Sequence, residues 1–336
     1  MWVPAVANLL LLSLGLLEAI QASGHSFSCI PEPFQTSILF SQDTPLDMAL
    51  DLFDDEYVGC EAAMTAALPH LNLTEFHANK VYADGWAKAS HKWRELQDQC
   101  PARLPPLPVG FREEHVVALL AYMDESHLYK EFNSAVRQAG RSRAHYLQHF
   151  SFKTLHFLLT EALQLLRKDQ RQSGCRRVFR GVEGQRFQPA GPGATVRLGI
   201  FASSSLKKNV AHCFGNKTFF SIWTCLGVPF QNYSVIPEEH KVLIPPFETF
   251  QVINTSRLPG GCVYIELQAL DKRSSYNCEY IKGEEDTPRI SQLRNQPIIV
   301  SLSAASAQER LSTAWSLLLL LAFLAVGPFP GSPGLF

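Results

Sequence analysis

The sequence has 336 residues, of which 46% are hydrophobic and 18% charged, and its formal net charge is −1. A chain of this length can bury a substantial core in one or two globular domains. The balanced charge excludes the basic stripe of a nucleic-acid-binding protein, and the sequence contains no long acidic tail.

The first 22 residues have the features of a secretory signal peptide. The apolar run from Leu9 to Leu17 has signal-peptide length, and Ala22 offers a small residue for cleavage before Ser23. We therefore expect residues 1–22 to be removed and residues 23–300 to form the mature domain.

Helical patterns prevail from about residue 44 to residue 170. The spacing of Tyr82, Trp86 and Trp93 is close to one or two helical turns, which favours core packing. A Pro-rich connector occupies residues 101–110. Helical patterns resume at Glu114–Tyr122, at Leu128–Gln138, which Gly140 ends, and at Thr154–Leu166.

After Gly174 the apolar runs become short, β-branched and aromatic, and Gly and Pro separate them. We expect strands at Arg177–Val182, Ala194–Ser203, Thr218–Cys225, Val242–Phe250 and Cys262–Leu267. A helical first half and a β-rich second half, at about 175–280, predict an α+β fold with segregated helices.

The last segment, residues 301–336, resembles a lipid-anchor signal. Small residues near Ser301 precede a polar spacer and an apolar run from Trp315 to Val326, with no Lys or Arg after it. A single-pass helix is the alternative, but such helices are usually about 20 residues long and followed by basic residues. We expect the segment to be removed and the protein to be GPI-anchored on the extracellular face of the plasma membrane.

The cysteines and the glycosylation sequons agree with export. The even number of eight cysteines contains no CxxC pair, so disulfides are favoured over zinc. The spacing alone leaves the pairings open, including those of Cys29, Cys100, Cys213 and Cys262. N-x-[ST] sequons are present at Asn72, Asn216, Asn232 and Asn254.

Two places in the second half carry polar residues that a strand would not need. Arg180 lies between Phe179 and Gly181 in an apolar strand pattern, where an arginine is costly unless it is paired or binds an anion. It is either a ligand for phosphate oxygens, with Gly181 allowing close approach of the ligand, or an edge-strand arginine that faces water. The serines at 203–205 follow another strand, and they are either site residues or a serine-rich strand end.

A third place is the stretch from Tyr233 to Phe250, in which an acidic turn enters a β-prone run. Such a turn can hold a carboxylate at the edge of a cleft. His145 and His149 stand four residues apart on an expected helix, but without the glutamate of an HExxH motif they are interpreted as structural.

Together these places resemble the arginine-specific, lipid-anchored mono-ADP-ribosyltransferases of the vertebrate cell surface. The resemblance covers nearly the whole chain and rests on long stretches: FDDEYVGC, NKVYADGWA, AGRSRAHYL, HFSFKTLHFLLTEALQLL, VFRGV, WTCLG, VLIPPFETFQVIN and SSYNCEYIK. It implies a helical N-terminal region followed by a split β-sheet NAD-binding core. It also implies disulfides Cys60–Cys278 and Cys175–Cys225.

The resemblance also implies site residues and partners. Arg180 and Gly181 would hold NAD together with Ser203 and Ser205, and Ser203 would also orient the site. NAD would be the ADP-ribose donor, with no metal. The acceptors would be extracellular or cell-surface proteins with an exposed arginine.

The sequence departs from the family at the catalytic Glu-x-Glu motif. Glu239 stands at the first glutamate, which would orient the acceptor guanidinium, but Lys241 replaces the last one, which would stabilise the cationic transition state. An ammonium there opposes the chemistry. Two hypotheses follow: an NAD-dependent arginine transferase with weak activity, or an inactive relative that binds NAD or a protein partner.

Overall fold

The computed structural model describes residues 42–99, 104, 106–124, 127–169, 174–234 and 236–285. The expected signal peptide (1–22) and lipid-anchor signal (301–336) lie outside these residues, as do Cys29 and Cys100.

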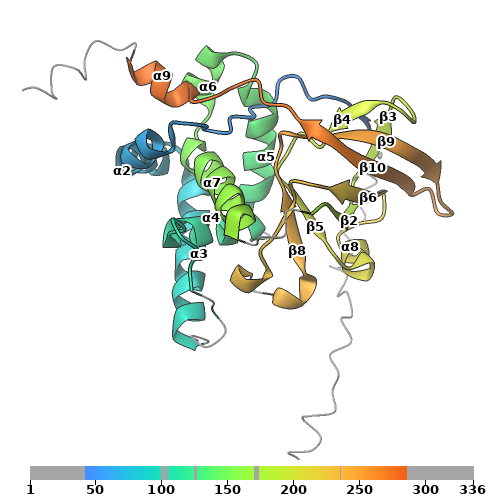
Figure 1. The fold of residues 1–336 in the computed structure, drawn as a ribbon, viewed down its shortest axis with the longest axis horizontal. Coiled ribbons are helices and arrows are strands. Elements are labelled where there is room, and N and C mark those ends of the chain that lie inside the picture. The colour runs from blue at the N-terminus through green and yellow to red at the C-terminus, as the bar shows by residue number, and fades with distance from the viewer. Residues whose placement is uncertain are drawn as a thin grey trace, which may run out of the picture. The chain divides into compact units, whose positions relative to one another are not determined.

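Helices pack beside a β-sheet in the described part of the chain (Figure 1). The helices are α2 (Glu61–Ala78), α3 (Lys80–Gln99), α4 (Glu113–Met123), α5 (His127–Ala139), α6 (Arg143–His149), α7 (Lys153–Asp169), α8 (Lys208–Cys213) and α9 (Glu279–Glu285). The strands are β1 (Gln42–Leu46), β2 (Arg176–Val182), β3 (Gln185–Pro189), β4 (Thr195–Arg197), β5 (Ala202–Ser205), β6 (Thr218–Thr224), β7 (Val228–Pro229), β8 (Lys241–Ile244), β9 (Glu248–Arg257) and β10 (Val263–Lys272). Two 3₁₀ turns, η2 (Gln231–Tyr233) and η3 (Pro237–Glu239), precede β8. The α+β prediction is confirmed.

The helical core forms around α7, whose apolar residues are buried on several sides. Tyr82 and Trp93 of α3 are buried in the same cluster and Trp86 packs against it, as predicted. The carboxylate of buried Glu75 accepts hydrogen bonds from the backbone N–H groups of Lys153 and Thr154, at 2.6 and 2.9 Å. Because these N–H groups have no partner within the helix, α2 supplies the acceptors that stabilise the start of α7.

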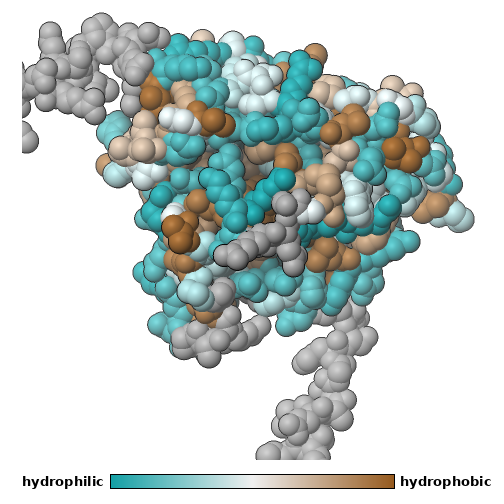
Figure 2. Space-filling model, viewed as in Figure 1, coloured by the Kyte–Doolittle hydropathy of each residue, from teal (hydrophilic) through white to brown (hydrophobic). Residues whose placement is uncertain are grey.

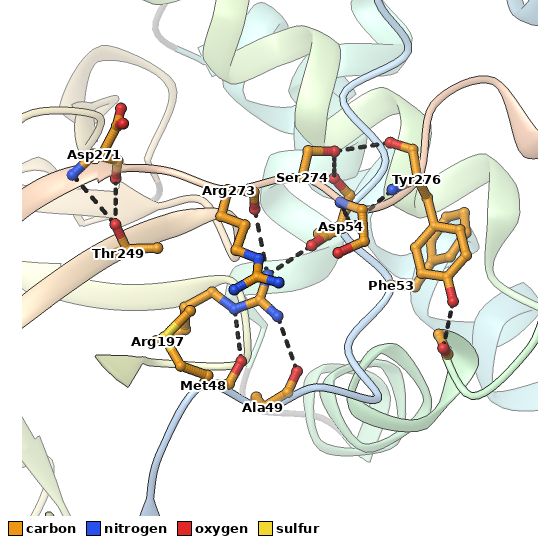
Figure 3. Close-up of polar contacts among 12 residues, drawn as sticks. Met48, Ala49, Phe53, Asp54, Arg197, Thr249, Asp271, Arg273, Ser274 and Tyr276 are labelled. Carbon is orange, nitrogen blue, oxygen red and sulfur yellow. Dashed lines mark hydrogen bonds and ion pairs between the residues drawn. The ribbon is translucent and has the colours of Figure 1, made fainter. Parts of the chain in front are cut away.

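The chain before α2 is not helical, although helix was expected from about residue 44. Residues 47–60 are extended or turned, and a buried ion pair holds them (Figure 3). Arg197 Nη1 lies 2.6 Å from Asp54 Oδ2, and both side chains are almost fully buried. Arg197 also donates to the carbonyls of Met48 and Ala49. These contacts use backbone groups that a helix would have satisfied internally.

The main sheet has the strand order β4-β9-β10-β6-β2-β5-β8-β7. A parallel pair of β1 and β3 forms a second, small sheet. β2 pairs with β6 along its whole length, but with β5 only at Phe179 and Ser205. The sheet therefore opens between β2 and β5, as expected for a split sheet.

Two expected strands are each divided in the structure. The run from Ala194 to Ser203 forms β4 and β5, and the run from Val242 to Phe250 forms β8 and β9. Pro245 and Pro246 separate β8 from β9, since proline cannot donate to a ladder of hydrogen bonds. β1 and β3 were not expected from the sequence.

Both disulfides implied by the family resemblance are formed, Cys60–Cys278 and Cys175–Cys225. The first joins the start of α2 to the segment before α9, and the second joins the start of β2 to the end of β6. Cys262 carries a free thiol.

Candidate functional site

The three places singled out in the sequence come together across neighbouring strands. Phe179 on β2 pairs with Ser205 on β5, and Ser205 pairs with Lys241 on β8. Since neighbouring strands lie about 4.8 Å apart, the backbones of β2 and β8 are about 10 Å apart at this row. Arg180, the serines and the acidic turn thus border the opening of the sheet.

Arg180 lies on an interior strand, because β2 is flanked by β6 and β5. The edge-strand interpretation is therefore wrong. Its Nη1 donates a 2.6 Å hydrogen bond to the carbonyl of Ser203, across the opening. Burial lowers the pKa of the guanidinium, opposed by Tyr122 and Tyr129 nearby. No carboxylate of the described residues forms an ion pair with Arg180, so its positive charge remains available to an anion.

A buried pair of polar side chains fixes the chain that leads to Ser203. Asn133 Oδ1 accepts from the backbone N–H of Phe201 at 3.2 Å, and the Tyr122 hydroxyl donates to the Phe201 carbonyl. Asn133 Nδ2 in turn donates to the Tyr122 oxygen at 2.8 Å. Burial raises the pKa of Tyr122 to about 12, so the phenol stays protonated as a donor. α4 and α5 thus position β5, which the apolar helical pattern around Tyr122 did not indicate.

Gly181 is required by the packing of the chain around it. A Cβ atom at this position would lie 2.2 Å from the carbonyl oxygen of Ala211 and 2.5 Å from that of Gly215. The end of α8 therefore packs directly on β2. The close approach of the chain's own backbone is enough to require a glycine here, and the contact of Gly181 with NAD stays a prediction.

The three serines have different surroundings. The Ser205 hydroxyl donates to the Glu239 carbonyl at 2.6 Å and accepts from the Lys207 N–H at 2.9 Å, so it ties β5 to the acidic turn. Ser204 Oγ is buried and has no hydrogen-bond partner in the described part of the chain. Ser203 is half-buried, and its carbonyl contacts Arg180.

Glu239 and Lys241 form an ion pair at the start of β8. Glu239 Oε2 lies 2.6 Å from Lys241 Nζ, and the two side chains are only 11% and 13% exposed. Glu239 Oε2 has no hydrogen-bond partner among the described residues, so its contact with Lys241 is an ion pair. Between them His240 adopts the left-handed conformation, with φ 47° and ψ 50°, which turns the chain from η3 into β8.

The other sequence candidates lie elsewhere. His145 and His149 line a cavity among the helices, and none of the candidate NAD residues lines it. Asn72 is half-buried in α2 and accepts a 2.8 Å hydrogen bond from the Tyr82 hydroxyl, whereas Asn216, Asn232 and Asn254 are exposed.

Within the described residues, no group of three or more His, Cys, Asp or Glu side chains is arranged to hold a metal ion. The same residues contain no helix that is long and apolar enough to cross a membrane. On the face shown in Figure 2, hydrophobic residues form small separate patches among hydrophilic ones. Two exposed hydrophobic residues, Leu206 and Ile236, follow β5 and precede η3.

Comparison with known proteins places this geometry in a family. Residues 46–275 match the family described as "NAD:arginine ADP-ribosyltransferase". The chain is 70% identical over 342 residues to the GPI-linked NAD(P)(+)–arginine ADP-ribosyltransferase 1 of Oryctolagus cuniculus, covering all of both chains. It is 59% identical over 341 residues to the Homo sapiens protein of the same name, again covering all of both.

A solved structure agrees with these matches. The crystal structure of the mono-ADP-ribosyltransferase ART2.2 is similar with a TM-score of 0.59 and 34% identity, covering 70% of this chain and 99% of that one. A variant of ART2.2 with one glutamate replaced by isoleucine, similar to the same degree, was solved in complex with NAD. The family match spans α2 to α8, the opened sheet and the Arg180 strand, and the chain belongs to the NAD:arginine ADP-ribosyltransferase family.

Proposed function

We propose that this protein is an NAD-binding, cell-surface member of the family in which Lys241 suppresses transfer to arginine. The observation that carries the proposal is the ion pair between Lys241 and Glu239, at 2.6 Å, where the family resemblance implies two glutamates. In this proposal Arg180 binds NAD, whereas the position of Lys241 governs the chemical step, so NAD can bind without being turned over.

Arg180 has the properties required to bind the diphosphate of NAD. A partly buried guanidinium without a carboxylate partner is favourable only where an anion completes its hydrogen bonds. Its fork also matches two phosphate oxygens at once. The unpartnered hydroxyl of Ser204 lies on the strand facing it and provides a further polar group near the opening. An ART2.2 variant with one glutamate replaced by isoleucine was solved with NAD bound, so in that relative NAD binding tolerates the loss of a glutamate.

The chemical step is where Lys241 acts. Transfer breaks the bond between nicotinamide and ribose, and the transition state gains positive charge on the ribose. A unit charge about 4 Å away contributes about 4 kcal/mol at an effective dielectric near 20, with a sign that depends on the charge. Replacing a carboxylate by an ammonium reverses that sign. Even a net loss of about 4 kcal/mol slows the step roughly a thousandfold.

The ion pair also affects the acceptor. Glu239 is the residue expected to orient the incoming arginine, yet its carboxylate already contacts an ammonium of the same chain. An acceptor guanidinium therefore has to displace Lys241 before it can bind. Lys241 therefore opposes both the breaking of the nicotinamide–ribose bond and the binding of the acceptor arginine.

A second function, slow arginine transfer, is favoured by one observation. Glu239 keeps a carboxylate in the site, only 2.6 Å from the ammonium that replaces the last glutamate. Were Lys241 to turn toward solvent, Glu239 would be the acidic group left for the ribose and the acceptor. In that case replacing Glu239 by Gln abolishes the remaining turnover.

The decisive experiment is nicotinamide release from NAD, with and without a small guanidine acceptor. Wild type is compared with Lys241→Glu and with the neutral Lys241→Met, while NAD affinity is measured separately by calorimetry. We expect similar NAD affinity in all three, very slow release in the wild type and a gain of at least about a hundredfold in Lys241→Glu. Fast wild-type release that Glu239→Gln removes would establish the second function instead.

The cellular location follows from the relatives, whose names include "GPI-linked". We propose the same lipid anchor here, which places the site outside the cell. If Lys241→Glu restores transfer, its acceptors are extracellular or cell-surface proteins with an exposed arginine. Release of the protein from intact cells by a phosphatidylinositol-specific phospholipase C tests the anchor, and retention would favour a single-pass helix.

A further inference from the structure

We propose that the oligosaccharide attached to Asn254 folds back over one face of the β-sheet and covers the half-exposed aromatic side chains there. This outer sheet face is formed by Arg177, Trp223, Tyr264 and Glu266, which lie on β2, β6 and β10. The sequon alone predicts the attachment, whereas the contacts of the attached sugars follow from the sheet. Attachment requires the export that underlies the cellular location proposed above.

The residues of the outer sheet face are brought together across three strands. Arg177 Nη1 donates a 2.7 Å hydrogen bond to Glu266 Oε1, and its guanidinium lies 5.9 Å from the centre of the Trp223 ring. Tyr264 and Glu266 stand two apart on β10, so they point to the same side. Ile265 between them is fully buried on the other side. The outer sheet face therefore turns away from the core of the sheet.

Asn254 belongs to the same face. It lies on β9 and pairs directly with Glu266 on β10. Directly opposed residues of antiparallel strands share a face, with Cβ atoms about 5 Å apart. Asn254 is exposed, and its side-chain amide has no hydrogen-bond partner among the described residues. Asn72, by contrast, is half-buried and accepts a hydrogen bond from Tyr82. A sugar attached to Asn254 therefore starts on the outer sheet face.

Attachment forms one bond and breaks one. Asn254 Nδ2 bonds to C1 of N-acetylglucosamine and loses one proton. The bond from that C1 to the diphosphate of a lipid-linked oligosaccharide breaks, and the diphosphate leaves with the electron pair and takes up the proton. Nothing is oxidised or reduced. Thr255 and Ser256 complete the sequon.

The chemistry of the outer sheet face suits a sugar chain. A pyranose ring has C–H groups that pack on aromatic surfaces and hydroxyl groups that form hydrogen bonds. Trp223 and Tyr264 are half-buried, so covering them removes further apolar surface from water. Within the described residues, neither Trp223 Nε1 nor the Tyr264 hydroxyl has a hydrogen-bond partner. The guanidinium of Arg177 adds donors and the carboxylate of Glu266 adds acceptors for sugar hydroxyls.

The reach of the oligosaccharide also fits. Trp223 on β6 lies two strands from Asn254 on β9, a separation of about 10 Å. The first sugar therefore lies over β10, and the sugars after it reach Trp223. The same oligosaccharide is bulky, so it keeps another protein from packing on the face that it covers.

Hydroxyl-radical footprinting read by mass spectrometry tests the proposal, with full-length protein purified from the membranes of mammalian cells. Glycopeptide analysis of the same samples shows which sequons are occupied. In Asn254→Gln, we expect Trp223 and Tyr264 to be oxidised several-fold faster than in the wild type. Trp86, half-buried on α3, is the internal reference and should not change. The matched control is Asn216→Gln, an exposed sequon after α8, which should leave the oxidation of Trp223 as in the wild type.

A second measurement needs no substitution. Enzymatic removal of the oligosaccharides from the folded wild type should raise the oxidation of Trp223 and Tyr264 in the same way. Equal oxidation with and without the oligosaccharide would show that it points away from the sheet and overturn the proposal. Protection that persists in Asn254→Gln but disappears on dilution would make a second copy of the chain the occupant instead.

The occupancy of the sequons separates this proposal from the cellular location. An unmodified Asn254 beside a modified Asn216 or Asn232 would overturn the covering of the sheet and leave the export of the chain supported. The absence of oligosaccharide from every sequon would overturn both.

Discussion

Glu239 and Lys241 bring opposite charges to within 2.6 Å of each other although one residue separates them in the chain. The left-handed turn at His240 and the bond from the Ser205 hydroxyl to the Glu239 carbonyl hold the segment in place. The two charges cancel, so the exposed Glu238 carries the remaining negative charge of the turn, which does not attract NAD. Electrostatic attraction of NAD by the site must therefore come from Arg180, on the other side of the opening.

Replacing Arg180 by Lys should weaken NAD binding by about ten- to a hundredfold. A lysine keeps the charge but not the planar pair of donors that matches two phosphate oxygens. Calorimetric titration with NAD measures the effect. Arg177→Lys is the matched control, because it lies on the same strand but is 46% exposed and pairs with Glu266. Equal affinities for the two variants would remove Arg180 from the NAD site.

Gly181→Ala should destabilise the fold by about 3 kcal/mol, because the new methyl group collides with the Ala211 and Gly215 carbonyls. These carbonyl groups are part of the backbone, so they can move away from the methyl group only if the end of α8 and the residues after it shift. Urea unfolding measures the loss. Gly174→Ala serves as control, since a Cβ atom there meets nothing within 4 Å. A stable Gly181→Ala protein that fails to bind NAD would contradict the packing role and support the predicted contact of Gly181 with NAD.

Asp54→Ala should cost about 3–5 kcal/mol of stability, because it leaves the buried guanidinium of Arg197 without its counter-charge. The exposed pair of Lys80 and Asp84 provides the contrast, and Asp84→Ala should change stability by about 1 kcal/mol or less. Both variants are compared in urea unfolding. A double variant that also replaces Arg197 by Met should recover much of the loss, which a purely steric effect of Asp54→Ala would not allow.

Glu248 should make stability depend on pH. Its carboxylate accepts from the Thr224 hydroxyl and from the Cys225 and Leu226 N–H groups, yet burial outweighs these bonds and raises its pKa above the ordinary 4.5. The folded state thus binds a proton more tightly than the unfolded chain. Between the two pKa values the folded state holds more protons, so this group's contribution to stability falls as pH rises.

Glu248→Gln removes the titrating carboxyl group but keeps a side-chain oxygen that can accept hydrogen bonds from the Cys225 and Leu226 N–H groups. We expect the variant to gain stability relative to the wild type as pH rises from about 4.5 through the raised pKa. Denaturant unfolding at a series of pH values gives the difference, with exposed Glu61→Gln as the control. A difference that stays constant with pH would show that the carboxylate titrates normally.

Much of the fold could be predicted from the sequence because its helices and strands follow their own periodicity. α7 appears as a stripe of leucines and β2 as a short β-branched run, and both begin within one residue of the expected positions. The stretch before α2 could not be predicted. Its conformation depends on Asp54 and Arg197, which lie more than a hundred residues apart in the chain and meet only in the folded core.

The sequence indicated three places for a candidate site, but not how these places lie relative to one another. The pattern around Arg180 left an edge strand possible, because strand order is set by distant pairings. The role of Gly181 depends on α8, whose carbonyls approach it from 30 residues later in the chain. The family resemblance predicts a glutamate where Lys241 stands, but the contact of Lys241 with Glu239 depends on the turn at His240 and could not be predicted.

The disulfide between Cys60 and Cys278 has a consequence for the protein outside the cell. It closes a loop of 218 residues that contains nearly all of the described helices and strands. A protease that cuts the chain once within this loop therefore leaves two fragments that remain covalently joined. A nicked protein would keep its size in a non-reducing gel, and only reduction would separate its two parts.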